Sequence, residues 1–305
     1  MSENLYKLWT TQFSTNLTLK LQQQGSKLRG KVMEGFHVGK QASPVQEMGP
    51  IALRAPAGRF APKNRTEADF TRRWVFPQDG EIDQLIDSFD ELKTIVDPKS
   101  KYSTNAANAV GRAWDDAIIT AATASASIGT DPASFSTETF DTTKFRIADT
   151  FGSSAASGLT VAKLKEARRI FRKYHVDIET TPITLVIGSQ GESDLLNQVE
   201  VVSKEFNDRP VLTDGKVVRF MGFDIAYSER LPTYTTNTRG VLAFAKSGMY
   251  LGMWKELTNR VSVRNDLSGE PYDLYTSVSY GAVRLEPGHV LQIACLDSTG
   301  ADITP

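Results

Sequence analysis

The sequence predicts an α+β protein, and three patterns in it lead to that prediction. An alanine-rich stretch carries Val110, Trp114 and Ile118 at helical spacing. The apolar run Ile183–Ile187 is typical of a buried strand and precedes a short helical pattern. Several strand patterns then follow one another to the end of the chain. At roughly 100–200 residues per domain, a chain of 305 residues is expected to form two compact units.

The composition excludes several classes of protein. Thirty-five basic against 36 acidic residues give a net charge of −1, so no global positive field attracts nucleic acid. Cys295 is the only cysteine and there are three histidines, which excludes a disulfide framework and a thiolate zinc site within one chain. Apolar runs are far shorter than the roughly 20 residues of a membrane span. Residues 1–10 lack the apolar stretch of a signal peptide, so neither export nor membrane insertion is expected.

The first 77 residues are predicted to form an arm followed by a long extended loop. Leu5, Leu8 and Phe13 fall at helical spacing, and Leu17, Leu19 and Leu21 then alternate as in a strand. Residues 25–77 are rich in Gly, Pro and Arg and show no periodic apolar face. Ten basic residues against four acidic ones make this loop locally positive.

The next segment, 79–97, reverses the charge, with seven acidic residues and one lysine. Ile82, Leu85, Ile86 and Phe89 predict an amphipathic helix here, which Pro98 would end. Adjacent segments of opposite charge cancel within one chain, but they can also attract each other between neighbouring copies.

A longer helix is predicted at about 103–125, capped by Ser103 or Thr104. Its alanines permit close approach but bury little area, so we expect a brace across another layer. Residues 133–158 are predicted to form short strands and loops, with a domain boundary near Gly158.

The second half is predicted to begin with a helix capped by Thr160, with an apolar face opposite a basic one that includes Lys163 and Arg172. The strand Ile183–Ile187 turns at the residues GSQG into a short helix, and Asp214-Gly215 predicts a hairpin. Further strands are expected at 222–227, 241–245, 249–253, 261–264, 274–285 and 290–296.

Histidine, cysteine, aspartate and serine residues are present, but their positions in the sequence do not form a recognisable catalytic or metal-binding motif. Each histidine lies in a different predicted element, without Asp and Ser at a motif spacing. Cys295 fits a buried strand, and Asp115 and Asp116 diverge on a helix and are expected at the surface. GSQG lacks the glycine and lysine pattern of a phosphate loop, so a capped turn is the better interpretation. We therefore predict no catalytic, cofactor-binding or metal-binding residues.

The order of these elements resembles the major capsid proteins of tailed bacteriophages, which have the Hong Kong 97-type fold. The local resemblance lies in three stretches: RRWVFPQDGEIDQLIDSFDELKTIVDPKSKYSTNAANAVGRAWDDAIITAATA, RPVLTDGKVVRFMGFDIAYSERLP and YDLYTSVSYGAVRLEPGHVLQIACLD. The resemblance implies an N-terminal arm at 1–34, an extended loop at 35–78 that lies over a neighbour, a peripheral domain at 79–158 with 259–305, and an axial domain at 159–258.

The resemblance also implies a function and partners. Copies would form pentamers and hexamers of an icosahedral shell around double-stranded DNA, without catalysis, in a virion assembled in the bacterial cytoplasm. A separate scaffolding protein, a portal protein, a decoration protein and weak contact with the packaged DNA are the expected partners. The residues expected at contacts between subunits are Arg54, Arg59, Arg65, Arg72, Arg73, Asp83, Asp87, Asp90 and Glu91.

Three alternatives remain open from the sequence. The first is a nanocompartment shell of the same fold that encloses an enzyme. The second is a monomeric α+β enzyme with its site near Ser189 and Glu192, which would leave the 25–77 loop without a purpose. The third is a nucleic-acid-binding module that uses the basic helix face at 163–173.

Overall fold

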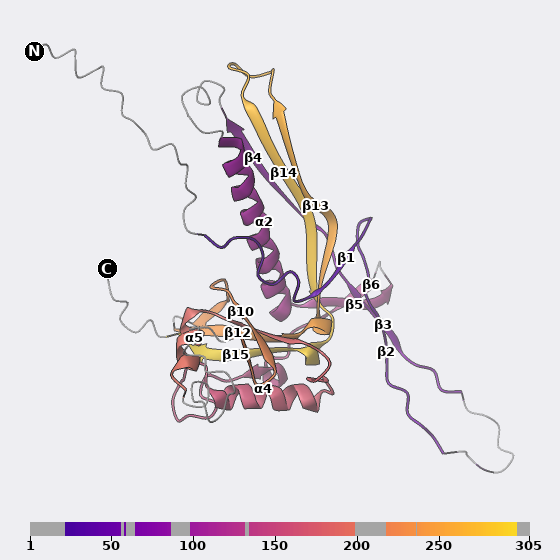
Figure 1. The fold of residues 1–305 in the computed structure, drawn as a ribbon. Coiled ribbons are helices and arrows are strands. Elements are labelled where there is room, and N and C mark those ends of the chain that lie inside the picture. Colours follow the sequence, from indigo (N-terminus) through magenta and orange to yellow (C-terminus); the bar gives the residue numbers. More distant parts are fainter. Residues whose placement is uncertain are drawn as a thin grey trace, which may run out of the picture. The chain divides into compact units, whose positions relative to one another are not determined.

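The computed structural model describes residues 22–55, 58, 65–86, 98–131, 134–198, 218–235 and 237–297 (Figure 1). These residues form an α+β fold, as predicted, and divide into two compact units. The first unit contains residues 22–26, 79–86, 98–112 and 255–278, and the second contains the other described residues. Among the described helices, none is both long and apolar enough to cross a membrane.

The first unit is built on helix α2 (Pro98–Thr123) and the outer parts of three strands. The strands belong to a sheet in the order β1 (Met33–Phe36), β13 (Met249–Val263), β14 (Tyr272–Arg284) and β4 (Gln78–Ile86). The first half of α2 runs beside this sheet (Figure 1). Asn259 of β13 links the two, because its side chain donates to Ser103 Oγ at 3.0 Å and accepts from Thr276 Oγ1 at 2.9 Å.

The predicted start of α2 is wrong. The helix begins at Pro98, not after a cap at Ser103 or Thr104. Proline suits the first turn, because the N–H group that it lacks would have had no partner there. Pro98 therefore lies in the first turn of this helix.

The predicted helix at 79–97 is also wrong over its first part, which is strand β4. Burial alternates along β4: Gly80, Ile82 and Ile86 are covered, whereas Asp79, Glu81, Asp83 and Leu85 are exposed. Ile82 and Ile86 are four residues apart, a spacing that fits one face of a helix and one face of a strand equally well. Pairing with β14 decides for the strand. Residues 87–97 lie outside the described part.

The second unit contains a seven-stranded sheet in the order β7-β15-β12-β8-β10-β9, with β11 paired to β12. Its strands are β7 (Arg146–Ile147), β15 (Val290–Leu296), β12 (Thr238–Ala245), β8 (Ile183–Ile187), β10 (Phe223–Tyr227), β9 (Arg219–Phe220) and β11 (Thr233–Thr235). Strand β8 lies between β12, which is antiparallel to it, and β10, which is parallel. The predicted strands 183–187, 222–227, 241–245 and 290–296 are thus confirmed. The predicted 249–253 and 261–264 strands are parts of one long strand, β13.

Two helices of this unit also match the sequence pattern. Helix α4 (Val161–Lys173) has Thr160 as its cap and buries Leu164 and Phe171. Helix α5 (Ser189–Leu196) follows β8 directly. Cys295 is buried, as predicted, and burial raises the pKa of its thiol to about 12.

Lys163 departs from the prediction that it lies on the solvent face of α4. It is fully buried, and its Nζ donates to the carbonyl oxygens of Ser157, Gly158 and Ala294 at 2.6, 2.9 and 3.1 Å. Burial lowers the pKa of Lys163, and the three carbonyls supply the hydrogen bonds that a buried ammonium requires.

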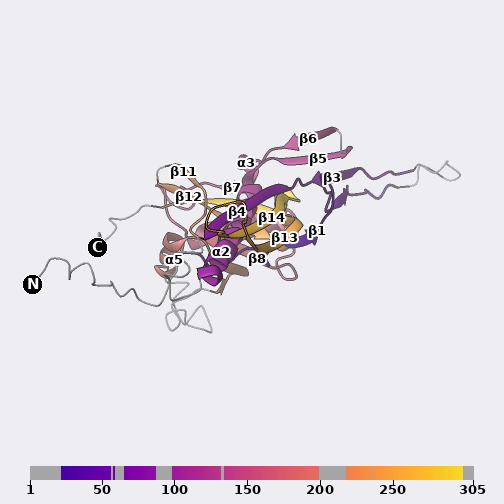
Figure 2. The same cartoon turned by 90° about the horizontal axis from the view of Figure 1, so that it is seen from above.

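A second sheet of this unit has four short strands, in the order β2 (Gln46–Met48), β3 (Phe70–Trp74), β5 (Ala126–Asp131) and β6 (Ser134–Glu138). Figures 1 and 2 both show β5 and β6 beside β3. The helix α3 (Thr142–Phe145) follows, and two short 3-10 turns lie at Lys246–Gly248 and Pro287–His289. The segment expected to be a structureless loop therefore contains β1, β2 and β3. The predicted arm up to residue 21 and the hairpin at Asp214-Gly215 lie outside the described residues.

Candidate functional site

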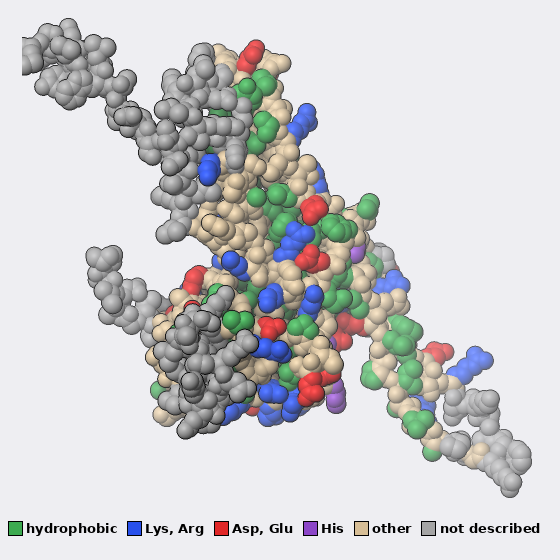
Figure 3. Space-filling model, viewed as in Figure 1, with side chains coloured by type: hydrophobic (Ala, Val, Ile, Leu, Met, Phe, Trp, Pro, Cys, Tyr) green, Lys and Arg blue, Asp and Glu red, His purple; other side chains and the backbone are tan. Residues whose placement is uncertain are grey.

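The strands β2 and β3 form a two-stranded ribbon whose far part carries exposed apolar side chains. Met48 pairs with Phe70 across the ribbon, and these side chains are 61% and 49% exposed. Further along, Ile51 is 58% exposed and Leu53 is fully exposed. Figure 3 shows hydrophobic side chains at the surface of this ribbon, at the lower right of the view. We use the name apolar ribbon face for the exposed pair Met48 and Phe70 together with Ile51 and Leu53, which lie in the segment that follows β2.

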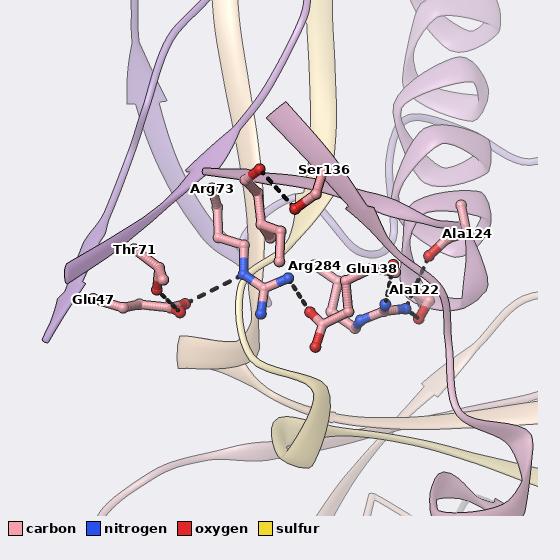
Figure 4. Close-up of polar contacts among 9 residues, drawn as sticks. Glu47, Thr71, Arg73, Ala122, Ala124, Ser136, Glu138 and Arg284 are labelled. Carbon is pink, nitrogen blue, oxygen red and sulfur yellow. Dashed lines mark hydrogen bonds and ion pairs between the residues drawn. The ribbon is translucent and has the colours of Figure 1, made fainter. Parts of the chain in front are cut away.

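An ion-pair network holds the base of the ribbon (Figure 4). Arg73 of β3 is only 5% exposed, and its Nε lies 3.4 Å from Glu47 Oε1 on the neighbouring strand β2. Its Nη1 donates to a carboxylate oxygen of Glu138 on β6. Thr71 Oγ1 also donates to Glu47, at 3.4 Å. Arg73 therefore joins the ribbon to the other side of its own sheet.

A second buried arginine continues the network to the end of α2. Arg284 of β14 is fully buried, and its Nη1 donates to the carbonyl oxygens of Ala122 and Ala124 at 3.0 Å each. Its Nη2 lies 3.5 Å from the Glu138 carbonyl, and its guanidinium stands 5.2 Å from the centre of the Phe140 ring. A helix leaves its last carbonyls without partners, and a cation at that end satisfies them and complements the helix dipole.

Glu138 joins the two arginines, because its side chain binds Arg73 and its backbone carbonyl accepts from Arg284. Burial raises the pKa of Glu47, an effect that Arg73 opposes. Burial also lowers the pKa of Arg284. The hydrogen bond from His289 lowers the pKa of nearby Glu286, with Nε2 and Oε2 3.0 Å apart. The arrangement places these charges where they hold neighbouring elements together.

The structure separates the residues that the sequence proposed for subunit contacts. Arg73 is engaged within its own chain, and Arg72 lies half-buried with Nη2 3.4 Å from Gln46 Oε1. Arg54 and Arg65 are exposed beyond the ribbon strands, and Asp83 is on the exposed face of β4. The other four, Arg59, Asp87, Asp90 and Glu91, lie outside the described residues.

The sequence interpretation missed Glu47, Glu138 and Arg284. A signal existed for Arg284, because it is a lone charge near the end of a strand that alternates apolar and small residues. Glu47 and Glu138 carry no such signal, since only the pairing of β2, β3, β5 and β6 brings them to Arg73.

The prediction that Asp115 and Asp116 are both surface residues is wrong for Asp115. Asp115 is fully buried, and its two carboxylate oxygens accept from the backbone N–H groups of Lys27 and Leu28 at 2.9 and 3.1 Å. Asp116 is at the surface and forms a two-pronged pair with Arg230. The two side chains diverge, as predicted for adjacent positions of a helix, but the side chain of Asp115 points into the fold.

The remaining chemistry-bearing residues have structural partners. His37 Nε2 is 2.6 Å from the Tyr250 hydroxyl, and His289 Nδ1 is 3.1 Å from Ser247 Oγ. The turn at GSQG is capped by the Glu229 carboxylate, which accepts from the Ser189 N–H. Within the described ranges, no group of three or more His, Cys, Asp or Glu residues is placed to hold a metal ion.

Comparison with known proteins finds one matching family model and a set of similar solved structures. The family model described as phage capsid protein matches residues 6–297. The capsid structure of the cyanophage P-SCSP1u is similar, with a TM-score of 0.74 and 16% identity over 98% of this chain and 97% of that one. A Mycobacterium phage Che8 structure has a TM-score of 0.68 and 15% identity over 94% and 97%. The capsid of a native GTA particle has a TM-score of 0.67 and 15% identity over 97% of each chain. No curated protein matches.

Proposed function

This chain belongs to the phage capsid protein family, and we propose that its copies associate into pentamers and hexamers of an icosahedral shell that encloses double-stranded DNA. The predicted Hong Kong 97-type fold is confirmed, and the family and fold identify a structural protein and not an enzyme. What we propose is the form of the shell, which is icosahedral and built from pentamers and hexamers, and its content, which is double-stranded DNA.

The apolar ribbon face is the observation that carries the proposal. An isolated two-stranded ribbon is marginally stable in water. Each large apolar side chain gains about 1.5–3 kcal/mol when it moves from water into a full contact. The buried Arg73 network holds the base of the ribbon, so the apolar face is presented on an anchored support. A second copy of the chain is the partner that a shell-forming family supplies.

Domain roles and contact residues follow as parts of the same proposal. We assign the arm to 1–34, the extended loop to 35–78, the peripheral domain to 79–158 with 259–305, and the axial domain to 159–258. The exposed Arg54 and Arg65, the half-buried Arg72 and, from its position in the sequence, Arg59 are proposed to contact acidic residues of a neighbour. The acidic residues Asp83, Asp87, Asp90 and Glu91 are proposed to contact basic residues of a neighbour. For Arg73 we propose a role at the ribbon base.

The proposed partners are those of a tailed-phage capsid. Copies would assemble in the bacterial cytoplasm on a separate scaffolding protein and around a portal protein, and a decoration protein could bind the finished shell. Contact with packaged DNA would be weak and non-specific, because the chain has no net positive charge. The alternative is a nanocompartment shell of the same fold with an enzyme inside.

Sedimentation of the purified protein at increasing concentration, with electron microscopy of the fast fractions, tests the proposal. Rings, tubes or closed shells are the expected products, and nuclease-protected DNA in particles from infected cells separates a phage capsid from a nanocompartment. Replacing Ile51 and Leu53 with Asp should suppress assembly, whereas Val218→Asp, at a site 66% exposed on the second unit, should not. Assembly unchanged by both substitutions would contradict the role of the ribbon.

A further inference from the structure

A small pocket lies at the β7 edge of the seven-stranded sheet in the second unit. Its volume is about 240 Å³, less than the roughly 300–1,000 Å³ of a site for a drug-sized molecule, so its size suits a small ion or a single charged group. The residues that line it are Thr142, Arg146, Ala148, Asp149, Thr238 and Ala294.

An aromatic ring supports Arg146 in this pocket. Arg146 is half-buried, and its guanidinium carbon lies 4.5 Å from the centre of the Tyr234 ring. Gly240 of β12 leaves room for that ring, because a Cβ atom at this position would come within 2.3 Å of Tyr234 Cε2. A guanidinium that stacks on a ring keeps the N–H donors at its edge available. The sheet therefore presents an oriented arginine to the pocket.

Arg146 forms no ion pair with a carboxylate among the described residues. Asp141, which caps α3, pairs with Lys144, and the two charged atoms are 3.0 Å apart. Asp149 lines the pocket, and its charge is balanced by the buried Lys163. Burial lowers the pKa of Lys163, and the charge of Asp149 is among the groups that oppose this shift. The pocket therefore has one positive charge in excess.

Gln292 adds a second donor on the same face of the sheet. Strand β15 pairs with β7 in parallel with Gln292 opposite Arg146, and residues in register share a face. Gln292 is 1% exposed, and its Nε2 is buried without a hydrogen-bond partner in the described part of the chain. A buried donor without an acceptor costs free energy, and an anion bound to Arg146 would supply the acceptor.

We propose that this pocket binds a phosphate-type oxyanion, with the Arg146 guanidinium as the main donor and the Gln292 amide beside it. A guanidinium donates two parallel hydrogen bonds to two oxygens of a phosphate group. The remaining oxygens can accept from Gln292 and from the hydroxyl groups of Thr142 and Thr238. Inorganic phosphate and the phosphate groups of DNA share this chemistry. The site is independent of the proposed shell function, because one chain contains every residue named here.

Titration of the unassembled full-length protein with inorganic phosphate tests the site. Calorimetry measures the binding, with sodium chloride replacing phosphate so that ionic strength stays constant. We expect Arg146→Gln to weaken binding about tenfold, because charged hydrogen bonds are lost. Arg146→Lys keeps the charge but lacks the fork and should weaken binding about threefold. The matched control is Arg172→Gln, at an exposed arginine of α4 that does not line the pocket, which should change little.

Gln292→Leu separates a role in binding from a role in packing. It removes a buried donor that has no partner among the described residues, so the urea midpoint of the phosphate-free protein should stay at the parent value or rise. Phosphate binding should weaken about threefold at the same time. A lower midpoint with unchanged phosphate binding would overturn the assignment of Gln292 to the site.

The variants also separate a bound ion from a general effect of phosphate, which stabilises many proteins because it is excluded from their surfaces. Equal binding and stabilisation in the parent protein, Arg146→Gln and Arg172→Gln would overturn the site, as would a parent protein that binds no phosphate. A short DNA duplex that displaces phosphate from the parent protein would identify DNA as the source of the group, and a duplex that leaves phosphate bound would identify the free ion. Chains that bind phosphate but never form particles would overturn the shell function and leave this site standing.

Discussion

Buried charges of this chain are satisfied mainly by backbone groups. Lys163 and Arg284 are fully buried, and each donates to three carbonyl oxygens. Asp115 shows the same principle for an anion, because its buried carboxylate accepts hydrogen bonds from two backbone N–H groups. Such hydrogen bonds offset much of the cost of burying an ion without a second buried charge, although the Nε of Arg284 is buried and has no hydrogen-bond partner among the described residues. These residues therefore fix backbone segments in place.

The same three residues show what sequence patterns miss at this scale. Charged residues are normally exposed, so a helix pattern assigns Lys163 and Asp115 to the surface. The partners that bury them are distant in the chain: Ala294 lies 131 residues from Lys163, and Lys27 lies 88 from Asp115. Cys295, by contrast, was placed correctly because a small apolar residue in an alternating strand needs no such partner.

The surface pair Arg264–Asp266 gives a prediction about pH. Two hydrogen bonds of 2.8 Å from Arg264 lower the pKa of Asp266 to about 2. A pKa below the unfolded value means that the contribution to stability is present above the usual Asp pKa, near 3.8, and is lost as the pH falls toward 2. Arg264→Gln should return the pKa of Asp266 toward 3.8, as followed by NMR titration of the carboxyl carbon. Arg260→Gln, at an exposed arginine of β13, the strand that ends one residue before Arg264, should leave it low, and an equal effect of both changes would contradict the assignment.

At the scale of helices and strands, the spacing of apolar residues predicted an element correctly where that spacing fitted only a helix or only a strand. Helix α4 begins one residue after its predicted cap at Thr160, and β15 spans the predicted 290–296. The failure at β4 has the opposite cause, since Ile82 and Ile86 satisfy both periods and the pairing partner is almost 200 residues away. The ribbon strands β2 and β3 are too short and too polar to be detected, and their partners β5 and β6 hold them in place.

The C-terminal end of α2 depends on Arg284, which yields a prediction about stability. Replacing Arg284 with Met removes the donors to Ala122, Ala124 and Glu138 and leaves buried carbonyl groups without partners. We expect the free energy of unfolding to fall by about 3 kcal/mol, within the range for unpaired buried groups. Urea unfolding of the unassembled protein measures this change.

The control for that experiment is Arg72→Met, because Arg72 is a half-buried arginine with a single long hydrogen bond to Gln46. It should cost no more than about 0.5 kcal/mol. A buried ion can also be replaced by an apolar side chain without loss when the new packing is good. If Arg284→Met were as stable as the parent, the guanidinium would be a cost that the fold tolerates and not a support for α2.

At the scale of the whole molecule, the fold combines a well-packed sheet with an exposed ribbon, and the two make different demands. The seven-stranded sheet buries both faces of its strand β8 within the chain. The ribbon exposes its apolar face and is held at its base, where Arg73 binds Glu47 and Glu138. Sequence composition predicted an extended, locally basic loop here, but it did not reveal this anchor, because the anchor exists only once four short strands have paired.

This division predicts that the ribbon can be loosened without unfolding the rest. Arg73→Met should leave the carboxylates of Glu47 and Glu138 without their cation and cost about 2 kcal/mol, since Glu138 is 34% exposed and water partly compensates. Hydrogen exchange should accelerate at the backbone N–H groups of β2 and β3 while those of β8 and β12 stay protected. Particles of the variant should dissociate at a lower temperature than those of the parent protein. The loosened ribbon would have to become ordered when copies associate, and this ordering reduces the net free energy of association. Arg72→Met, on the same strand, is the control for the hydrogen-exchange measurement, because within the chain Arg72 makes only a long contact to Gln46 among the described residues. Uniform acceleration across both sheets would mean that Arg73 supports the second unit as a whole, and unchanged exchange in β2 and β3 would mean that backbone pairing alone holds the ribbon.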